Sequence, residues 1–222
     1  MSRSNQDLAP LFQSLFTAVV GDVMDQMGYQ DQFLPPSIKP LRDDMIVVGR
    51  AMPVLEADRA DVPAELLDKP FGVMLEALDD LKKGEVYICS GCSPDFALWG
   101  ELMSTRAQHL GAAGAVLDGY SRDTTGILEL NFPTFSYGNY AQDQAPRGSV
   151  VDFRTTITIG RVVIQPGDII FGDLDGVCVI PQKVEREVIE RATQKATTED
   201  QVRIAIEAGM PAVEAFRKYG VM

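Results

Sequence analysis

The order of the predicted elements is the feature that most limits the fold of this chain. Up to about residue 137, segments with helical spacing of apolar residues alternate with short apolar runs typical of buried strands. From residue 150 the pattern changes to short strands separated by turn residues. Helices are expected near residues 8–20, 71–78, 98–110, 125–130 and 184–208, with a short helix capped by Asp22 and a last one around Phe216. Strands are expected near residues 45–48, 51–55, 86–89, 115–117, 134–137, 151–153, 155–159, 162–164, 169–171 and 177–180. This order predicts a single α/β domain whose sheet has helices on one side and a second β layer on the other.

Residues 93–123 form the segment that the rest of the fold is expected to support. Ser93-Pro94-Asp95 offers capping residues and Gly111 offers a left-handed stop, so a helix is expected over residues 98–110. Ala115-Val116-Leu117 follows as a buried strand, and residues 118–123 leave its carboxyl end as a loop. In open α/β sheets, loops at this end carry ligand sites.

The polar residues of this segment suggest an anion site and a cation site side by side. The helix start near Gly100 presents unpaired backbone N–H groups, which can hold a small carboxylate. Arg122 carries a planar guanidinium suited to carboxylate or enolate oxygens, and Asp123 is a hard oxygen ligand for a divalent cation. Glu101 can complete the cation shell through water. The alternative is a solvated Arg122-Asp123 ion pair in a surface loop.

Several motifs place the chain near a known family. Trp99-Gly100-Glu101-Leu102, residues 111–114, the loop 118–123, Phe132-Pro133 and Pro166-Gly167-Asp168 resemble the RraA-like family over nearly the whole chain. This family includes regulators of ribonuclease E activity and metal-dependent 4-hydroxy-4-methyl-2-oxoglutarate/4-carboxy-4-hydroxy-2-oxoadipate aldolases. The resemblance implies a three-layer β/β/α sandwich, assembled as a homotrimer or a dimer of trimers. It also implies that the C-terminal helices, about residues 183–222, pack on a neighbouring subunit.

The enzymes of the family keep an acidic residue, twenty intervening residues and Arg-Asp, and this chain has Glu101 followed by Arg122-Asp123. By resemblance, Asp123 would hold Mg²⁺ or Mn²⁺ and Glu101 would act through water held by the metal. Arg122 would contact the pyruvyl part of the substrate. The backbone of Gly100, Glu101, Leu102 and Met103 would hold the substrate carboxylate. The best match for a further carboxylate, contributed by a neighbouring subunit, is Glu199.

The leading hypothesis is therefore a divalent-metal-dependent lyase acting on a 2-oxo acid, a pyruvate-type aldolase with oxaloacetate decarboxylase activity. Residues 151–153 and 215–220 look more like relatives that act on sugar acids, so a decarboxylase or lyase of a sugar-acid-derived oxo acid is the first alternative. The alternative of a different class is a non-catalytic inhibitor of ribonuclease E, which would not need Glu101, Arg122 and Asp123.

Composition excludes some function classes. The formal charge of −12 and the sequence pI near 4.5 argue against a surface built to bind nucleic acid. Neither a signal segment nor an apolar run of membrane-spanning length is found, so a cytoplasmic protein without membrane contacts is expected. Cys89 and Cys92 lack a second pair at metal-finger spacing, and His109, the only histidine, is expected to have a structural role at a helix end.

Two acidic segments are interpreted as structural or solvated. Glu56, Asp58 and Asp61 are expected in a charged, solvated loop over residues 56–63. Asp173-Leu174-Asp175-Gly176 superficially resembles a calcium loop, but the remaining ligand positions of that motif are missing, so a hairpin turn is expected.

Overall fold

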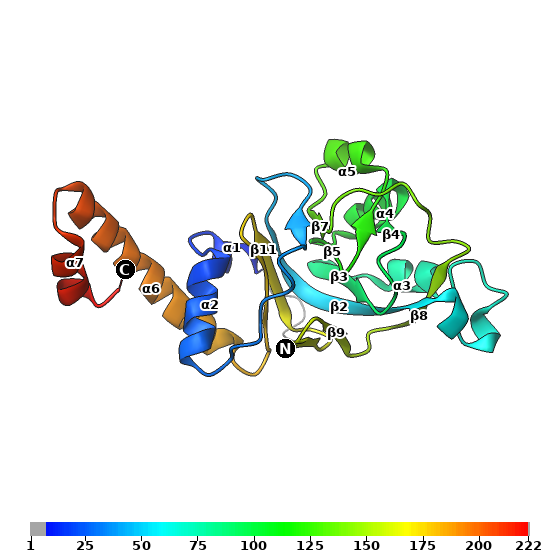
Figure 1. Ribbon diagram of the computed structural model, residues 1–222, viewed down its shortest axis with the longest axis horizontal. Helices are drawn as coiled ribbons and strands as arrows, with labels where there is room; N and C mark the ends of the chain where they lie inside the picture. The colour runs from blue at the N-terminus through cyan, green and yellow to red at the C-terminus, as the bar shows by residue number, and fades with distance from the viewer. Residues whose placement is uncertain (1–7, 222) are drawn as a thin grey trace.

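The computed structural model describes residues 8–221 and is built on a mixed eight-stranded sheet (Figure 1). The strands run in the order β1-β7-β5-β3-β2-β11-β12, with β8 paired to β2 outside this path. The pairs β2–β3, β3–β5 and β5–β7 are parallel, and the others are antiparallel. The strands are β1 (Lys39–Pro40), β2 (Val47–Asp58), β3 (Glu85–Ser90), β5 (Gly114–Leu117), β7 (Thr134–Ser136), β8 (Gly148–Phe153), β11 (Ile169–Asp173) and β12 (Gly176–Ile180).

Strand β2 is the central strand of the sheet and pairs with β3, β8 and β11. Its first residues, from Val47, pair with β11, and its last residues, up to Asp58, pair with β8. The second pairing contains a register shift: Leu55 lies opposite Asp152, but Glu56 lies opposite Val150, so β8 has one extra residue there. Two strands separated at Gly49 were expected here. That prediction is wrong, because the backbone continues through Gly49, where any side chain would meet the Gly84 carbonyl oxygen at 2.5 Å.

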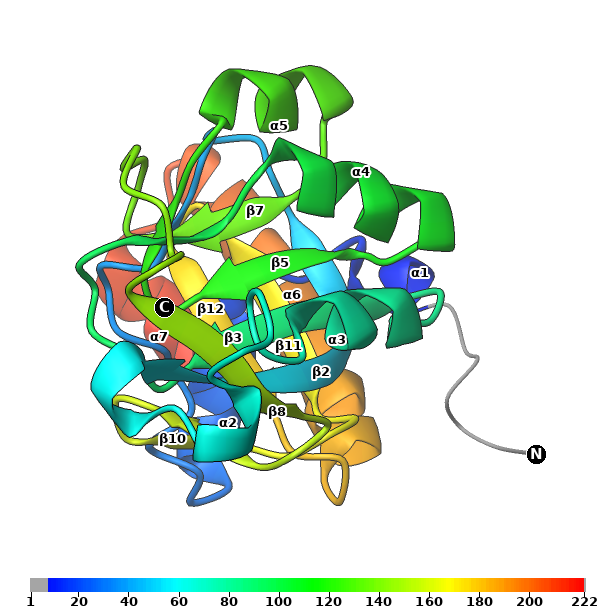
Figure 2. The same cartoon turned by 90° about the vertical axis from the view of Figure 1, so that its right-hand side faces the viewer.

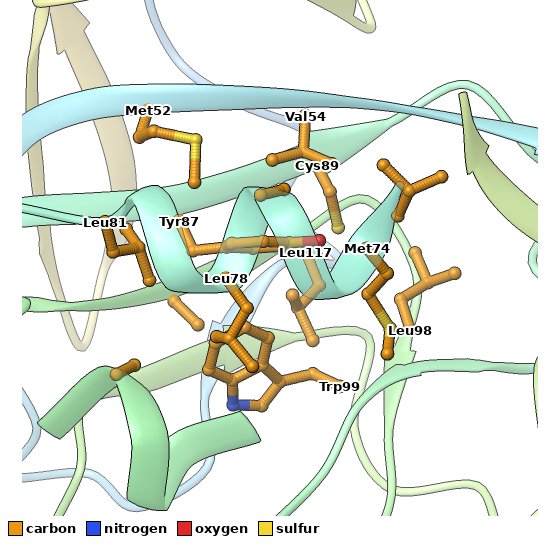
Figure 3. Packing of buried hydrophobic residues seen from close by; sticks show 14 of the residues in the cluster. Met52, Val54, Met74, Leu78, Leu81, Tyr87, Cys89, Leu98, Trp99 and Leu117 are labelled. Carbon is orange, nitrogen blue, oxygen red and sulfur yellow. The ribbon is translucent and has the colours of Figure 1, made fainter. Parts of the chain in front are cut away.

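Helices α3 (Met74–Asp80), α4 (Glu101–Leu110) and α5 (Thr124–Leu130) cover one face of the sheet (Figure 2). Beneath them lies a core that includes Tyr87 from β3 and Trp99 from β4 (Ala97–Trp99), whose ring centroids are 4.8 Å apart (Figure 3). Burial of each such ring contributes a few kcal/mol to the stability of the folded protein. The core fixes the end of β4, and with it the residues that follow Trp99.

The opposite face of the sheet packs against a second β layer. The hairpin of β9 (Ile157–Ile159) and β10 (Val162–Ile164) buries its alternate residues against Val86, Ile88 and Val116 of the main sheet. The expected α/β fold in three β/β/α layers is thereby confirmed. A further two-stranded parallel sheet joins β4 to β6 (Tyr120–Ser121), and its position decides the geometry of the candidate site.

A second group of helices covers the outer side of β11 and β12. Helices α1 (Ala9–Phe12) and α2 (Thr17–Gln26) and the first half of α6 (Glu185–Glu207) pack there. Helix α6 then extends away from the rest of the protein and is followed by the short helix α7 (Ala212–Tyr219), as Figure 1 shows. Exposed apolar residues gather on this extension, among them Ile204, Val213 and Phe216. Packing of residues 183–222 on a neighbouring subunit stays a prediction. Within residues 8–221, no helix is both long enough and apolar enough to cross a membrane.

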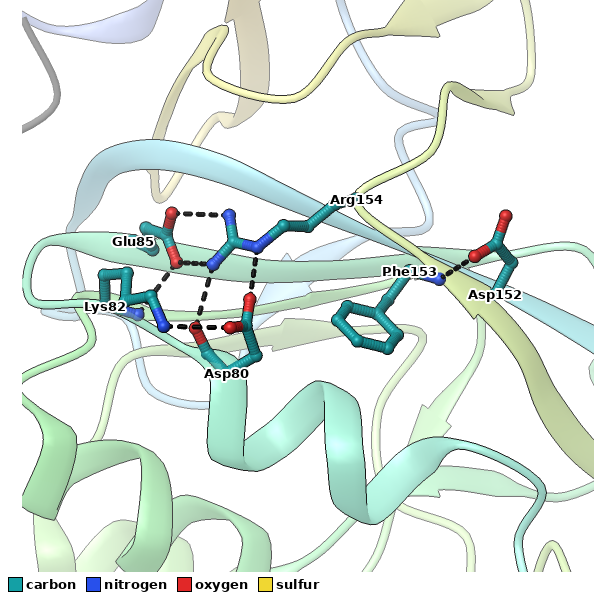
Figure 4. A network of polar contacts seen from close by, with 6 residues as sticks. All are labelled: Asp80, Lys82, Glu85, Asp152, Phe153 and Arg154. Carbon is teal, nitrogen blue, oxygen red and sulfur yellow. Dashed lines mark hydrogen bonds and ion pairs between the residues drawn. The ribbon is translucent and has the colours of Figure 1, made fainter.

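Arg154 links the helical layer to the sheet at the C-terminal end of α3. Its guanidinium forms ion pairs with Asp80 at the end of α3 and with Glu85 at the start of β3, the latter at 2.8 Å (Figure 4). These partners raise the pKa of Arg154 further above its usual range. Because α3 forms one wall of the pocket described below, this network helps to fix that wall.

Several predicted boundaries differ from the structure. The helix expected over residues 98–110 begins only at Glu101, because Leu98 and Trp99 belong to a buried strand, and Ser93 bonds to Asp58 instead of capping a helix. The helix expected over residues 8–20 is divided between α1 and α2, and Asp22 lies inside α2 rather than at its start. The hairpin turn at residues 173–176 is confirmed, and the Asp173 carboxylate accepts bonds from Thr17.

The solvated loop predicted for residues 56–63 is also corrected. Strand β2 continues to Asp58, and Glu56 is only 2% exposed. Asp58 is half-buried and accepts bonds from Ser93, whereas Asp61 is exposed as expected. A charged residue in a polar stretch resembles a loop residue, and the long-range pairing of β2 with β8 overrides that local signal.

Candidate active site

The parallel pairing of β4 with β6 brings the two halves of the predicted site together. Trp99 pairs with Ser121, and the Arg122 backbone N–H donates to the Trp99 carbonyl at 2.9 Å. Gly100 and Glu101 therefore lie beside Arg122 and Asp123, although twenty residues separate Glu101 from Arg122 in the chain. The Trp99 indole is buried and donates to the Ser104 hydroxyl at 2.6 Å, which locks the turn into α4.

Asp123 occupies the cap position of α5 in a left-handed conformation, with φ of 55°. Its Oδ2 atom faces Gly100, since a Cβ built on Gly100 would lie 2.7 Å from it. The Glu101 side chain, in the first turn of α4, rests on Gly126 of α5, where an added Cβ would lie 2.3 Å from its Cδ. Glycines at 100 and 126 thus make room for the two carboxylates between α4 and α5.

Arg122 is held by acidic neighbours on two sides. Its Nη1 atom lies 2.9 Å from Asp143 Oδ1, and its Nε atom lies 3.5 Å from Asp123 Oδ2. All three side chains are more than a third exposed, so these pairs orient the guanidinium more than they add stability. Asp143 was not predicted, because residues 139–147 carry no periodic pattern or motif.

Two hollows meet at the Arg122-Asp123 pair. One pocket of about 400 Å³ has a polar end at Arg122, Asp123, Asp143 and Gln144, and its other walls are mainly apolar side chains of α3, β4 and α4. These walls are Phe71, Met74, Leu75, Leu78, Ala97, Leu98, Trp99, Gly100, Leu102 and Met103. The second hollow lies on the other side of the pair and is lined by Thr124, Thr125, Asn139, Tyr140 and Ala141.

The predicted substrate-binding backbone lies at this pocket. Gly100 is the cap of α4, and the first intrahelical bond joins the Ser104 N–H to the Gly100 carbonyl. The N–H groups of Glu101, Leu102 and Met103 precede that bond, so they are the donors that the start of a helix leaves unpaired. The Leu102 side chain is 83% exposed and points away from the core.

Glu199 does not lie at this site within one chain. It is on the extended part of α6, 3.5 Å from Lys195, which in turn pairs with Asp22 of α2. Figure 1 shows this part of α6 and the helices α4 and α5 at opposite ends of the molecule. A role for Glu199 requires a neighbouring subunit and stays a prediction.

The other candidates have structural surroundings. Cys89, Cys92 and Cys178 are free thiols, and burial raises the pKa of each well above its usual range, which disfavours the reactive thiolate. His109 lies in the last turn of α4, as expected. Asp168 of the Pro166-Gly167-Asp168 turn is buried and accepts bonds from the backbone of Gln165 and Gln182.

Comparison with known proteins decides the family. The family model described as RraA-like, Aldolase/RraA, matches residues 17–179. The chain belongs to the RraA-like family. A relative from Halalkalibacterium halodurans named "Putative 4-hydroxy-4-methyl-2-oxoglutarate aldolase" is 30% identical, and the match covers 97% of this chain and 96% of the relative.

Solved structures agree with the RraA-like fold. An uncharacterized protein from Pseudomonas syringae pv. tomato superimposes with a TM-score of 0.81 at 28% identity, covering 97% of this chain and 99% of that chain. RraAS2 of Streptomyces coelicolor, titled an unusual member of the RNase ES inhibitor RraA family, has a TM-score of 0.79 at 20% identity. That match covers 91% of this chain and 98% of that chain, and it concerns the fold alone. The names of the similar proteins thus include both an aldolase and an RNase inhibitor.

Proposed function

We propose that this RraA-like protein is a divalent-cation-dependent lyase that cleaves a carbon–carbon bond of a 2-oxo acid, as a pyruvate-type aldolase with oxaloacetate decarboxylase activity. The observation that carries the proposal is the convergence of Asp123, Arg122 and the free N–H groups at the start of α4 on one pocket. An inhibitor that only masks a nuclease would not need this arrangement. The name of the H. halodurans relative points to the same chemistry.

The donor set fits Mg²⁺ or Mn²⁺ of the kind that keeps most of its water. Among residues 8–221, no group of three or more His, Cys, Asp or Glu side chains could enclose a metal ion. Magnesium typically binds through one or two carboxylates, and here Asp123 would hold it directly while Glu101 would reach it through water. Gly100 leaves the Asp123 Oδ2 atom uncovered on the side of the pocket. When bound, the cation would supply positive charge opposite the oxygens of the oxo acid.

The chain's own residues would bind and orient the substrate. The N–H groups of Glu101, Leu102 and Met103, aided by the helix dipole, would bind the 2-oxo acid carboxylate. The Arg122 guanidinium would donate to the keto oxygen, where negative charge develops as the carbon–carbon bond breaks. Asp143 keeps that guanidinium in place. The electron pair of the broken bond stays on the pyruvyl fragment as an enolate, and a proton then returns to its carbon. Glu101 is the nearest candidate to hold the water that supplies this proton.

The apolar walls would serve the leaving fragment. Met74, Leu78 and Leu98 give the part of the pocket beyond Arg122 an apolar lining. A carboxylate that leaves as carbon dioxide loses its charge in the reaction, so an apolar environment favours the product over the ion. No lysine is needed, which separates this route from Schiff-base aldolases.

A screen of 2-oxo acids tests the proposal. Purified protein would be incubated with oxaloacetate, 4-hydroxy-4-methyl-2-oxoglutarate or sugar-acid-derived oxo acids, with Mg²⁺ or Mn²⁺, and pyruvate would be measured by coupled reduction. We expect pyruvate release that stops after chelation and returns with the cation. No turnover of any oxo acid, together with tight capture of ribonuclease E by a variant lacking both Glu101 and Asp123, would support the inhibitor function instead.

We further propose that the protein works as a homotrimer or a dimer of trimers in which Glu199 of one subunit approaches Asp123 of the next. The support is the extended α6 and α7, whose exposed apolar residues are not covered by any other part of residues 8–221. The pocket is also open, with Leu75 and Leu102 more than half exposed at its rim.

A further inference from the structure

Glu56 is a buried acid that the proposed reaction does not use. It lies near the end of β2, only 2% exposed, and burial raises its pKa to about 8. At neutral pH the side chain is therefore mostly a neutral carboxylic acid. A group of this kind is costly to bury in its charged form, so its surroundings should favour the protonated state.

The contacts of Glu56 are few. Its Oε2 atom accepts a hydrogen bond of 2.6 Å from the Gln144 amide, which is itself 4% exposed. Its Oε1 atom is buried and has no hydrogen-bond partner among residues 8–221. The Tyr87 hydroxyl is likewise buried and unpartnered, and burial first and the Glu56 charge second raise the pKa of Tyr87. Unpaired buried polar atoms are rare and call for a reason.

Gln144 connects this buried acid to the candidate site. The residue before it, Asp143, forms the 2.9 Å ion pair with Arg122, and both Asp143 and Gln144 line the pocket. The Gln144 carbonyl also accepts bonds from the backbone of Arg147 and Gly148. The Gln144 side chain is thus bonded to Glu56 of β2, and the Gln144 carbonyl is bonded to the backbone at the end of the loop. Together these bonds hold residues 139–147 beside Arg122.

We infer that Glu56 is a positioning residue for Arg122, acting through the Gln144 side chain and the Asp143 carboxylate. The inference rests on the proposed function, because Arg122 is the group that it positions. In its neutral form Glu56 anchors Gln144 without placing a charge in the core. Ionisation leaves a buried carboxylate with a single amide donor, which favours release of the loop and admission of water.

The surroundings leave Glu56 as the group that changes charge near pH 8. The titratable and charged residues on the elements packed around it include Asp58, Tyr87, Cys89, Cys92, Asp118, Asp143, Arg147 and Asp152. Tyr87, Cys89 and Cys92 have pKa values raised above their usual ranges, so they stay protonated as the pH passes 8.

The test compares Glu56→Gln with wild type. The amide keeps the size of the side chain and an acceptor for Gln144, but it cannot ionise. We expect kcat/KM for oxaloacetate with Mg²⁺ to fall above pH 8 in wild type and to stay level in Glu56→Gln, with neutral-pH values within about twofold. Glu56→Leu, which removes the acceptor, should raise KM about tenfold at neutral pH with a smaller change in kcat. Glu129→Gln, an exposed change on α5, is the matched control and should behave as wild type.

A second readout does not depend on turnover. Amide hydrogen exchange of residues 139–148, corrected for the intrinsic rate, should increase from pH 7 to pH 9 in wild type and remain unchanged in Glu56→Gln. Gln144→Met removes the same contact from the other side and should raise exchange at both pH values, even if Glu56→Leu does not fold. Identical pH profiles and identical loop exchange in wild type and Glu56→Gln would overturn the inference. If no oxo acid is turned over, loop exchange alone still decides whether Glu56 anchors the loop.

Discussion

Gly100 faces the carboxylate of Asp123 so closely that a Cβ on residue 100 would lie 2.7 Å from Asp123 Oδ2. The φ of Gly100 is −153°, an extended conformation that any residue adopts. Glycine is therefore needed here for space and not for backbone freedom. The Asp123 carboxylate, which would hold the cation, occupies the space that a side chain at residue 100 would need.

Gly100→Ala should consequently damage the site without damaging the fold. The added methyl group would push the Asp123 carboxylate aside, so we expect cation-dependent turnover to fall roughly 100-fold. The melting temperature should shift by only a few degrees, since the backbone conformation suits alanine. Turnover assays across a Mn²⁺ titration would check this. Wild-type activity with wild-type cation affinity in Gly100→Ala would show that the Asp123 carboxylate can move away at no cost to the reaction.

Arg122→Lys tests the shape of the guanidinium. Lysine keeps the charge, but it cannot donate two parallel hydrogen bonds to neighbouring oxygens. We expect kcat/KM for the oxo acid to fall roughly 100-fold. Arg161→Lys, an exposed arginine paired with Asp31 away from the pocket, is the matched control and should keep wild-type kinetics. Full activity in Arg122→Lys would reduce Arg122 to a surface ion-pair partner.

Glu56 should also make folding stability depend on pH. Its pKa is raised from 4.5 to about 8 in the folded protein, so the folded state binds the proton more tightly than the unfolded chain does. The stabilisation is therefore complete below pH 4.5 and is lost as the pH rises toward 8, by at most about 5 kcal/mol. Urea unfolding at pH 5.5 and pH 8.5 would measure it. Glu56→Gln should lose less stability over this interval than wild type, and an equal loss in both proteins would contradict the assigned pKa.

A mixing experiment tests the shared site. Asp123→Asn and Glu199→Gln should each be nearly inactive as homo-oligomers if Asp123 meets Glu199 of the next subunit. Dissociation and random reassembly of equal amounts would create interfaces in which both residues are intact. About one quarter of the wild-type activity should then return. If subunit exchange is confirmed by mass and the mixture stays inactive, Glu199 acts within its own subunit or has no role in catalysis.

The sequence predicted the parts of the site that local signals encode. Gly111 ends α4 in a left-handed conformation, a buried strand follows, and its loop delivers Arg122 and Asp123, as the pattern of residues 111–123 indicates. The layered α/β arrangement also followed from the alternation of elements. Both rest on short-range features, namely turn residues and apolar spacing.

The remaining features depend on contacts between distant residues. Trp99 belongs to a strand and not to the helix, because β6 pairs with it and the core buries it. Glu56 is buried because β2 continues as a strand paired with β8, where a polar sequence suggested a loop. Asp143 meets Arg122 across a loop without regular pattern. No spacing rule encodes such contacts.

The central claim is that Asp123 holds a divalent cation for lyase chemistry on a 2-oxo acid. The most direct measurement is the rate of pyruvate formation from oxaloacetate, as a function of Mn²⁺ concentration, in wild type and Asp123→Asn. Asparagine tolerates the left-handed conformation of residue 123, so the variant should fold, whereas a neutral amide is a poor ligand for the ion. The account predicts saturable activation by Mn²⁺ in wild type and only the background rate in Asp123→Asn. Equal rates in the two proteins, or a wild-type rate that is unchanged after chelation, would contradict it.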